Sequence, residues 1–133
     1  MPVHVAARVA VLAQDLIWAD RLARAVAATG ADVVRVATLP ALEAALVEAR
    51  FVVVDLTARA YDGLAAIERA KAAGAHILAV GQHDDVDLRK RALAAGADRV
   101  LAYRKLFEDG PAAVEAWLAR ADRKRAVATA DRP

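Results

Sequence analysis

The chain has 133 residues, with 19 lysines and arginines against 17 aspartates and glutamates and a formal net charge of +2. This length suits one domain with a real core, and the near balance of charge gives no argument for nucleic-acid binding. The absence of cysteine excludes disulfides, thiolate metal sites and a cysteine nucleophile. Since no signal-peptide pattern and no apolar run near the ~20 residues of a membrane helix occur, we expect a soluble cytoplasmic protein.

Short apolar runs alternate with amphipathic segments along the chain. The apolar runs predict strands over 7–13, 31–37, 51–55, 76–80 and 99–103. The amphipathic segments predict helices over 17–29, 39–49, 62–73 and 84–95, and a last helix after the loop at 110–111. This alternation calls for an α/β fold, in which a five-stranded parallel sheet carries helices on both faces through right-handed crossovers. We expect a single domain over 1–121 and a polar tail over 122–133.

The run Phe51-Val52-Val53-Val54 leads directly into Asp55. Apolar residues on both faces are typical of a strand buried in a parallel sheet, so Asp55 should lie at the carboxyl end of that strand. In open α/β sheets, ligands and chemistry lie outside those ends. The alternative is that Asp55 begins a loop and hydrogen-bonds to its own backbone. The residues alone leave both interpretations open.

Three strings in register resemble the receiver domain of bacterial response regulators, the CheY-like family. Asp-Gly-Leu at 62–64 follows Asp55 at the family's distance, and Ala-Leu-Ala-Ala-Gly-Ala-Asp at 92–98 is similar to the end of the family's fourth helix. The third match is the distance from the end of the first strand to Gly30. The resemblance covers about 9–118. It implies a flavodoxin-like (βα)5 fold, a role in two-component signal transduction or a phosphorelay, and a phosphate-accepting aspartate at Asp55.

The chain departs from the family's pattern at the positions that perform the phosphoryl chemistry. The acidic pair that holds Mg²⁺ with the acceptor falls on Ala13 and Gln14, and Asp15 lies one position late. Mg²⁺ prefers hard oxygen ligands, of which Ala13 offers none and Gln14 only a neutral carbonyl. The phosphate-binding hydroxyl falls on Gly81, and the lysine that neutralises the phosphate falls on Tyr103.

Phosphoryl transfer to an aspartate depends mainly on positioning and charge neutralisation. The missing groups therefore indicate a degenerate receiver, or pseudo-receiver, that is not an enzyme, requires no cofactor, and acts as a phosphorylation-independent protein-interaction module.

Two other classes stay open. A working phospho-receiver would take phosphate on Asp55 from a histidine kinase, with Asp15 and Asp55 holding Mg²⁺ and Arg59 or Arg104 supplying the missing charge. A small-molecule binder on a flavodoxin-like sheet would need a phosphate cradle after the first strand. The stretch 13–18 contains no glycine, serine or threonine, which argues against that class.

Positive residues gather in the last third of the chain. The family's partner face is formed by its fourth helix, fifth strand and fifth helix. In this sequence that face would carry Arg89, Lys90, Arg91, Arg99, Arg104, Lys105, Arg120, Arg123, Lys124 and Arg125. We expect it to bind a protein partner or a second copy of the chain as a homodimer. The alternative is a solvated face with cations near helix ends. Nucleic acid is not expected, because no aromatic residues interleave the charges, and no membrane contact is expected.

Overall fold

Strands and helices alternate through the computed structural model, which describes residues 7–130 and the side chains as far as Arg123. The strands are β1 (Arg8–Leu12), β2 (Asp32–Val36), β3 (Phe51–Asp55), β4 (His76–Gly81) and β5 (Arg99–Ala102). The helices are α1 (Leu16–Ala27), α2 (Leu39–Ala45), α3 (Gly63–Ala72), α4 (Val86–Ala95) and α5 (Tyr103–Ala130).

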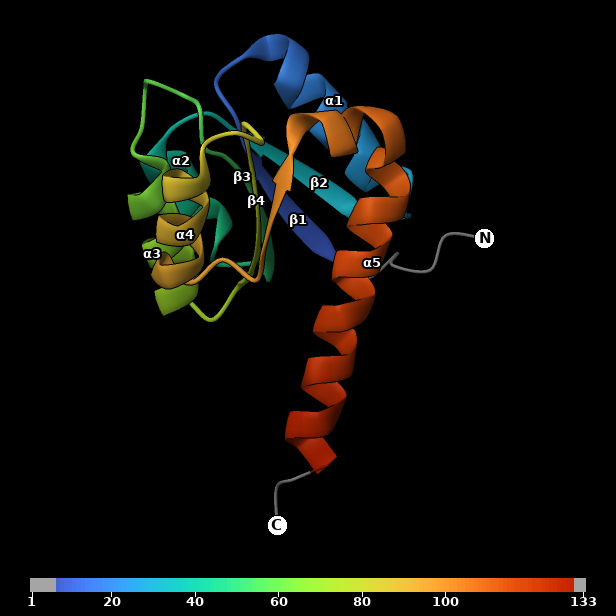
Figure 1. Cartoon of the computed structure of the whole chain (residues 1–133). Coiled ribbons are helices and arrows are strands. Elements are labelled where there is room, and N and C mark those ends of the chain that lie inside the picture. Colours follow the sequence, from blue (N-terminus) through green and yellow to red (C-terminus); the bar gives the residue numbers. More distant parts are fainter. Residues whose placement is uncertain (1–6, 131–133) are drawn as a thin grey trace.

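All five strands lie in one parallel sheet, in the order β2-β1-β3-β4-β5. Helices α1 and α5 cover one face of the sheet, and α2, α3 and α4 cover the other (Figure 1). The register pairs Leu12 with Val54 and Asp55 with Val80, so the carboxyl ends of β1, β3 and β4 meet at one edge. The predicted five-stranded flavodoxin-like (βα)5 architecture is confirmed.

Two apolar layers, one on each side of the sheet, form the core. Alternate residues of β3 belong to different layers: Val53 packs toward α1 and α5, and Val52 and Val54 pack toward α2, α3 and α4. Every residue of β3 is buried. A strand covered on both faces must be apolar at successive positions, which explains why the run 51–54 lacks polar residues and why Asp55 stands out.

Polar side chains begin four of the helices. Asp15, Thr38, Asp62 and Asp85 each accept a hydrogen bond from a backbone N–H in the first turn of α1, α2, α3 and α4, respectively. Such caps satisfy N–H groups that have no partner inside the helix. The cap at Asp15 matters for the site because it fixes the first residues after β1.

The C-terminal part of the chain differs from the sequence-based prediction. The fifth strand ends at Ala102 and not at Tyr103 as predicted. Tyr103 begins a helix that runs through the stretch expected to be a loop. This helix is interrupted at Asp109, whose φ and ψ are −144° and 31°, two residues before Pro111. A proline cannot donate the helical hydrogen bond, so the chain resumes the helix in a new direction.

The backbone of α5 stays helical to Ala130 and extends past the sheet (Figure 1). Most of the stretch predicted as a polar tail is thus helical, and the domain boundary at 121 stays a prediction.

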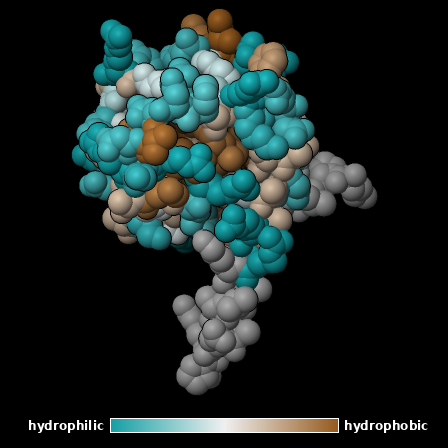
Figure 2. Space-filling view, viewed as in Figure 1, coloured by the Kyte–Doolittle hydropathy of each residue, from teal (hydrophilic) through white to brown (hydrophobic). Residues whose placement is uncertain are grey.

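The face shown in Figure 2 is largely hydrophilic, with apolar residues at the top, over the beginning of α1, and in the middle of the face, between α4 and α5. Leu16 and Ile17 are exposed at the beginning of α1, next to Asp15. Among the helices of the described part of the chain, none has the length and apolar character needed to cross a membrane.

Candidate functional site

Asp55 lies at the edge of the sheet where the strands end, as the last residue of β3. Its side chain borders an open cleft of about 680 Å³ between the loops that follow β1, β3 and β4 and the beginning of α5. The cleft is lined by Gln14, Asp15, Trp18, Asp55, Thr57, Ala58, Arg59, Gln82 and Tyr103. The sheet thus brings together four of the predicted pocket positions, Gln14, Asp15, Asp55 and Tyr103, with Arg59, one of the two cations considered as a replacement charge.

The carboxylate of Asp55 accepts its hydrogen bonds from two nearby residues. Its Oδ1 accepts from the backbone N–H of Thr57 at 3.0 Å, from the Thr57 hydroxyl at 2.9 Å and from the Tyr103 hydroxyl. The two hydroxyls also contact each other. Asp55 is 1% exposed as a residue, so a neutral donor network replaces most of its contact with water. Asp55 accepts a hydrogen bond from the backbone of the turn that follows it, and it also faces the cleft. Both sequence-based interpretations of Asp55 therefore describe part of its environment.

Tyr103 occupies the position that the family resemblance assigns to a lysine. As the first residue of α5 it points its hydroxyl at Asp55, and its ring packs on Trp18 with 4.2 Å between the ring centroids. Burial raises the pKa of the Tyr103 hydroxyl, and its hydrogen bond to Asp55 raises this pKa further. The hydroxyl therefore remains a neutral donor at physiological pH and brings no positive charge to the carboxylate.

The three residues after β1 are engaged in local structure. Ala13 is buried. The Oε1 atom of Gln14 accepts from the backbone N–H groups of Arg59 at 2.9 Å and Ala60 at 3.0 Å, which braces the loop after β3. The Oδ1 atom of Asp15 accepts from the N–H of Trp18 at 3.0 Å. Among the described residues, no three acidic, histidine or cysteine side chains are placed to hold a metal ion.

Two residues that the sequence analysis did not single out complete the site. Thr57 supplies two donors to Asp55, and the Tyr61 hydroxyl lies 2.6 Å from the carbonyl oxygen of Asp55 and 3.1 Å from that of Leu12. Tyr61 thereby ties the ends of β1 and β3 together. Burial, followed by the charge of Asp55, raises its pKa. A threonine two residues after an aspartate is a local turn signal, whereas nothing in the sequence indicates the partners of Tyr61.

Gly81 ends β4 and is buried. A Cβ atom at this position would lie 3.5 Å from Cδ1 of Leu56, an ordinary van der Waals contact. The site therefore lacks a hydroxyl here although the first atom of a side chain would fit.

The predicted basic face has its cations on α4, β5 and α5, and several of them form ion pairs within their own helix. Arg91 pairs with Asp87 at 3.7 Å, Arg104 with Glu108 at 2.9 Å and Lys105 with Asp109 at 3.2 Å. Arg89 and Lys90 are exposed on α4, and Arg99 is half-buried on β5. Of the predicted cations, Lys124 and Arg125 have side chains outside the described part.

No family model and no curated protein sequence match the chain. Solved structures do resemble it. NtrX from Brucella abortus aligns with a TM-score of 0.80 at 19% identity over 92% of this chain and 28% of its own length. A response regulator from Burkholderia pseudomallei, solved with a phosphorylated aspartic acid and a calcium ion, gives 0.72 at 21% identity over 96% of this chain and 75% of its own.

The receiver domain of the Francisella response regulator 1452 gives a TM-score of 0.72 at 15% identity over 86% of this chain and 98% of its own. At these identities the likeness establishes the fold, which is that of response-regulator receiver domains.

Proposed function

We propose that this receiver-fold chain is a signalling module of the pseudo-receiver type, which binds a protein partner in two-component signal transduction without phosphorylation of Asp55. The observation that carries the proposal is the neutral Tyr103 hydroxyl donating to Asp55 where a receiver's lysine would stand. Phosphoryl transfer places additional negative charge beside the acceptor, and cations must offset it. The proposed module is accordingly not an enzyme.

The residues after β1 support the same conclusion. A carbonyl oxygen has two lone pairs, and Gln14 uses its Oε1 for two backbone N–H groups. Asp15 is the carboxylate closest in sequence to the missing acidic pair, and it caps α1. Moving Gln14 onto a Mg²⁺ ion would leave two backbone N–H groups without their acceptor, so metal binding through Gln14 would compete with the local fold.

A second candidate is a working phospho-receiver that accepts phosphate on Asp55 with Mg²⁺ held by Asp15 and Asp55. One observation favours it. Every hydrogen bond to the Asp55 carboxylate among the described residues reaches Oδ1, which leaves Oδ2 without such a bond. Asp15 and Arg59 line the same cleft, as a carboxylate and a cation for that mechanism would.

Amide NMR separates the two candidates. The full chain is titrated with millimolar Mg²⁺ and then with beryllofluoride, which mimics a phosphoryl group on aspartate, and Asp55→Asn serves as the matched control. We expect no shifts that depend on Asp55. Shifts centred on Asp55, Asp15 and Gly81 that spread to β5 and vanish in Asp55→Asn would establish the phospho-receiver instead.

The partner surface and the cellular location belong to the proposal as well. The exposed cations of α4 and α5, with the half-buried Arg99 of β5, support a protein partner that carries negative charge. The cytoplasm is where a two-component module would act. A homodimer through this face is the other arrangement. It would bring like charges together across a two-fold axis, because a two-fold interface pairs the same surface of both copies.

A further inference from the structure

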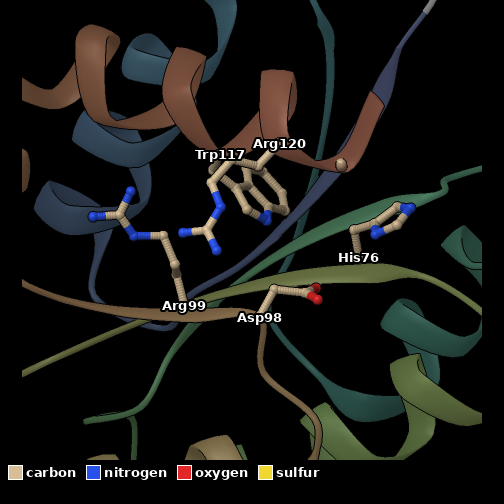
Figure 3. A pocket seen from close by; sticks show the side chains of 6 residues that line it. His76, Asp98, Arg99, Trp117 and Arg120 are labelled. Atoms are coloured by element: carbon tan, nitrogen blue, oxygen red, sulfur yellow. The ribbon is translucent and has the colours of Figure 1, made fainter. Parts of the chain in front are cut away.

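A second hollow lies at the opposite edge of the sheet from Asp55, at the amino ends of β4 and β5. It is lined by His76, Asp98, Arg99, Trp117, Arg120 and Ala121 (Figure 3). Asp98 precedes β5 and Arg99 begins it, while the residues at 117, 120 and 121 belong to α5. None of them takes part in the Asp55 cleft, so the hollow needs its own explanation.

Trp117 is the most informative residue of this hollow. Its side chain is almost fully enclosed, with the residue 2% exposed, and its ring packs edge-on against Phe51. Among the described residues its Nε1 has no hydrogen-bond acceptor. Figure 3 shows the indole nitrogen directed toward the space beside Arg120. A buried N–H without an acceptor is unfavourable, and a ligand that accepts this hydrogen bond removes the penalty.

Two arginines line the hollow together with Trp117. Within the part of the chain that the structure describes, neither Arg99 nor Arg120 forms an ion pair, and both line the hollow. Asp98 lines it too, and its Oδ2 accepts from the backbone N–H of Ile77 at 2.6 Å. Two arginines and one aspartate line the hollow, so its fixed charges are more positive than negative. Three donor groups therefore face a space that favours a singly charged anion.

The hollow is too small to enclose a whole metabolite, which limits the ligands that it can bind. The enclosed part admits a single water-sized atom. A metabolite site buries most of its ligand, which this hollow cannot do. A planar carboxylate matches a guanidinium with two parallel hydrogen bonds and could place one oxygen inward. A phosphate is tetrahedral and bulkier than a planar carboxylate, so it fits the enclosed part less well. These dimensions fit the end of a side chain whose main chain stays on the surface.

We propose that the hollow binds a carboxylate side chain, aspartate or glutamate, of a protein partner, held by Arg99 and Arg120 and accepting a hydrogen bond from the Trp117 indole. This inference deepens the proposed function, because it names the chemistry with which a partner is recognised. The hollow acts independently of Asp55, since the two lie at opposite edges of the sheet.

The indole N–H signals of the ¹⁵N-labelled full chain test this site directly. The chain has two tryptophans, so Trp18 is an internal control. Sodium acetate is titrated against sodium chloride at matched ionic strength. We expect acetate to move the Trp117 indole signal downfield with saturation and to leave the Trp18 signal in place. A Trp117 signal that acetate does not move would overturn the proposal.

Substitutions and other anions sharpen the test. Arg99→Gln or Arg120→Gln should raise the half-saturating acetate concentration roughly five- to tenfold. Arg123→Gln, an exposed position on α5 that does not line the hollow, should leave it unchanged. An acetate response that persists unaltered in both hollow variants, or tighter binding of inorganic phosphate than of acetate, would contradict the assignment.

A blocked tetraglutamate peptide and its tetraglutamine counterpart test the protein origin of the carboxylate. We expect the glutamate peptide to shift Trp117 at a lower concentration than acetate and the glutamine peptide to have no effect. Binding of acetate without binding of the glutamate peptide would restrict the site to small anions and would refute the proposal that a protein partner supplies the carboxylate. These results do not involve Mg²⁺ or Asp55, so failure here is distinguishable from failure of the pseudo-receiver proposal.

Discussion

At the scale of single residues, the site is defined by hydroxyl groups around one carboxylate. Thr57 and Tyr103 donate to Asp55, while Tyr61 ties the carbonyl oxygens of Asp55 and Leu12. Neutral donors stabilise a carboxylate but do not offset the charge of a phosphoryl group. Replacing or deprotonating these hydroxyl groups should therefore change the free energy of unfolding, which solution measurements can detect.

The raised pKa of Tyr103 and Tyr61 predicts a loss of stability in alkali. The ordinary tyrosine pKa is 10. Above that pH the unfolded chain loses these protons while the folded chain keeps them, so the stabilisation is complete below pH 10 and falls as the pH rises. The free energy of unfolding should fall by up to about 1.4 kcal/mol per pH unit for each tyrosine. Denaturant unfolding between pH 9 and 11.5 measures this slope.

The variant Tyr103→Phe isolates that contribution, because lysines also titrate in this range. Its slope should be shallower than that of the unsubstituted chain, and Tyr61→Phe should act in the same direction. At neutral pH, Tyr103→Phe should lose about 1 kcal/mol of stability with its hydrogen bond to Asp55. Identical slopes in all three chains would show that these hydroxyls are not held in the folded state.

A second prediction concerns Gln14. The variant Gln14→Ala removes the acceptor of the Arg59 and Ala60 N–H groups. Because both groups can then reach water, we expect a loss of only about 0.5–1.5 kcal/mol, together with faster amide exchange at these two residues. Hydrogen-exchange NMR measures this, with Gln82→Ala on the same cleft as the control. Unchanged exchange at Arg59 and Ala60 would contradict the bracing role.

At the scale of elements, the close approach of α5 to α1 depends on Gly110. A Cβ at Gly110 would lie 3.1 Å from Cβ of Ala25 on α1, which is a tight contact between two helices. We expect Gly110→Ala to destabilise the fold by about 1 kcal/mol, as overpacking does. In the double-mutant cycle with Ala25→Gly, the two losses should be less than additive, as measured by denaturant unfolding. Full additivity would show that the two sites do not contact each other.

The elements also show how far the sequence determines the site. The apolar run before Asp55 sufficed to predict a buried strand and an aspartate at its end, because burial on both faces leaves a local pattern. The contact between Tyr103 and Asp55 joins residues 48 positions apart and depends on the packing of α5, which local spacing does not reveal. Tyr103 was predicted to end a strand because it follows Val-Leu-Ala, yet its helical backbone directs the ring toward the cleft.

At the scale of the whole molecule, the basic face can be tested separately from the Asp55 cleft. Reversing the exposed cations of α4 in Arg89→Glu/Arg91→Glu should weaken partner binding several-fold, since complementary charge accelerates encounter and selects partners. Quantitative crosslinking of the tagged chain in its native extract measures the yield of each complex. Arg50→Glu, which reverses an exposed cation outside this face, is the control. Equal yields in both variants would exclude this surface.

The hydroxyl contacts of Asp55 bear on timing under the proposed function. A phosphorylated aspartate is a temporary mark, and its hydrolysis sets how long a signal lasts. A module that acts without phosphorylation, with its aspartate bonded to Thr57 and Tyr103, would have no signal lifetime set by hydrolysis. The duration of its effect would follow from synthesis, degradation and the dissociation of its complexes. The activity of this chain would then be controlled through its concentration in the cell.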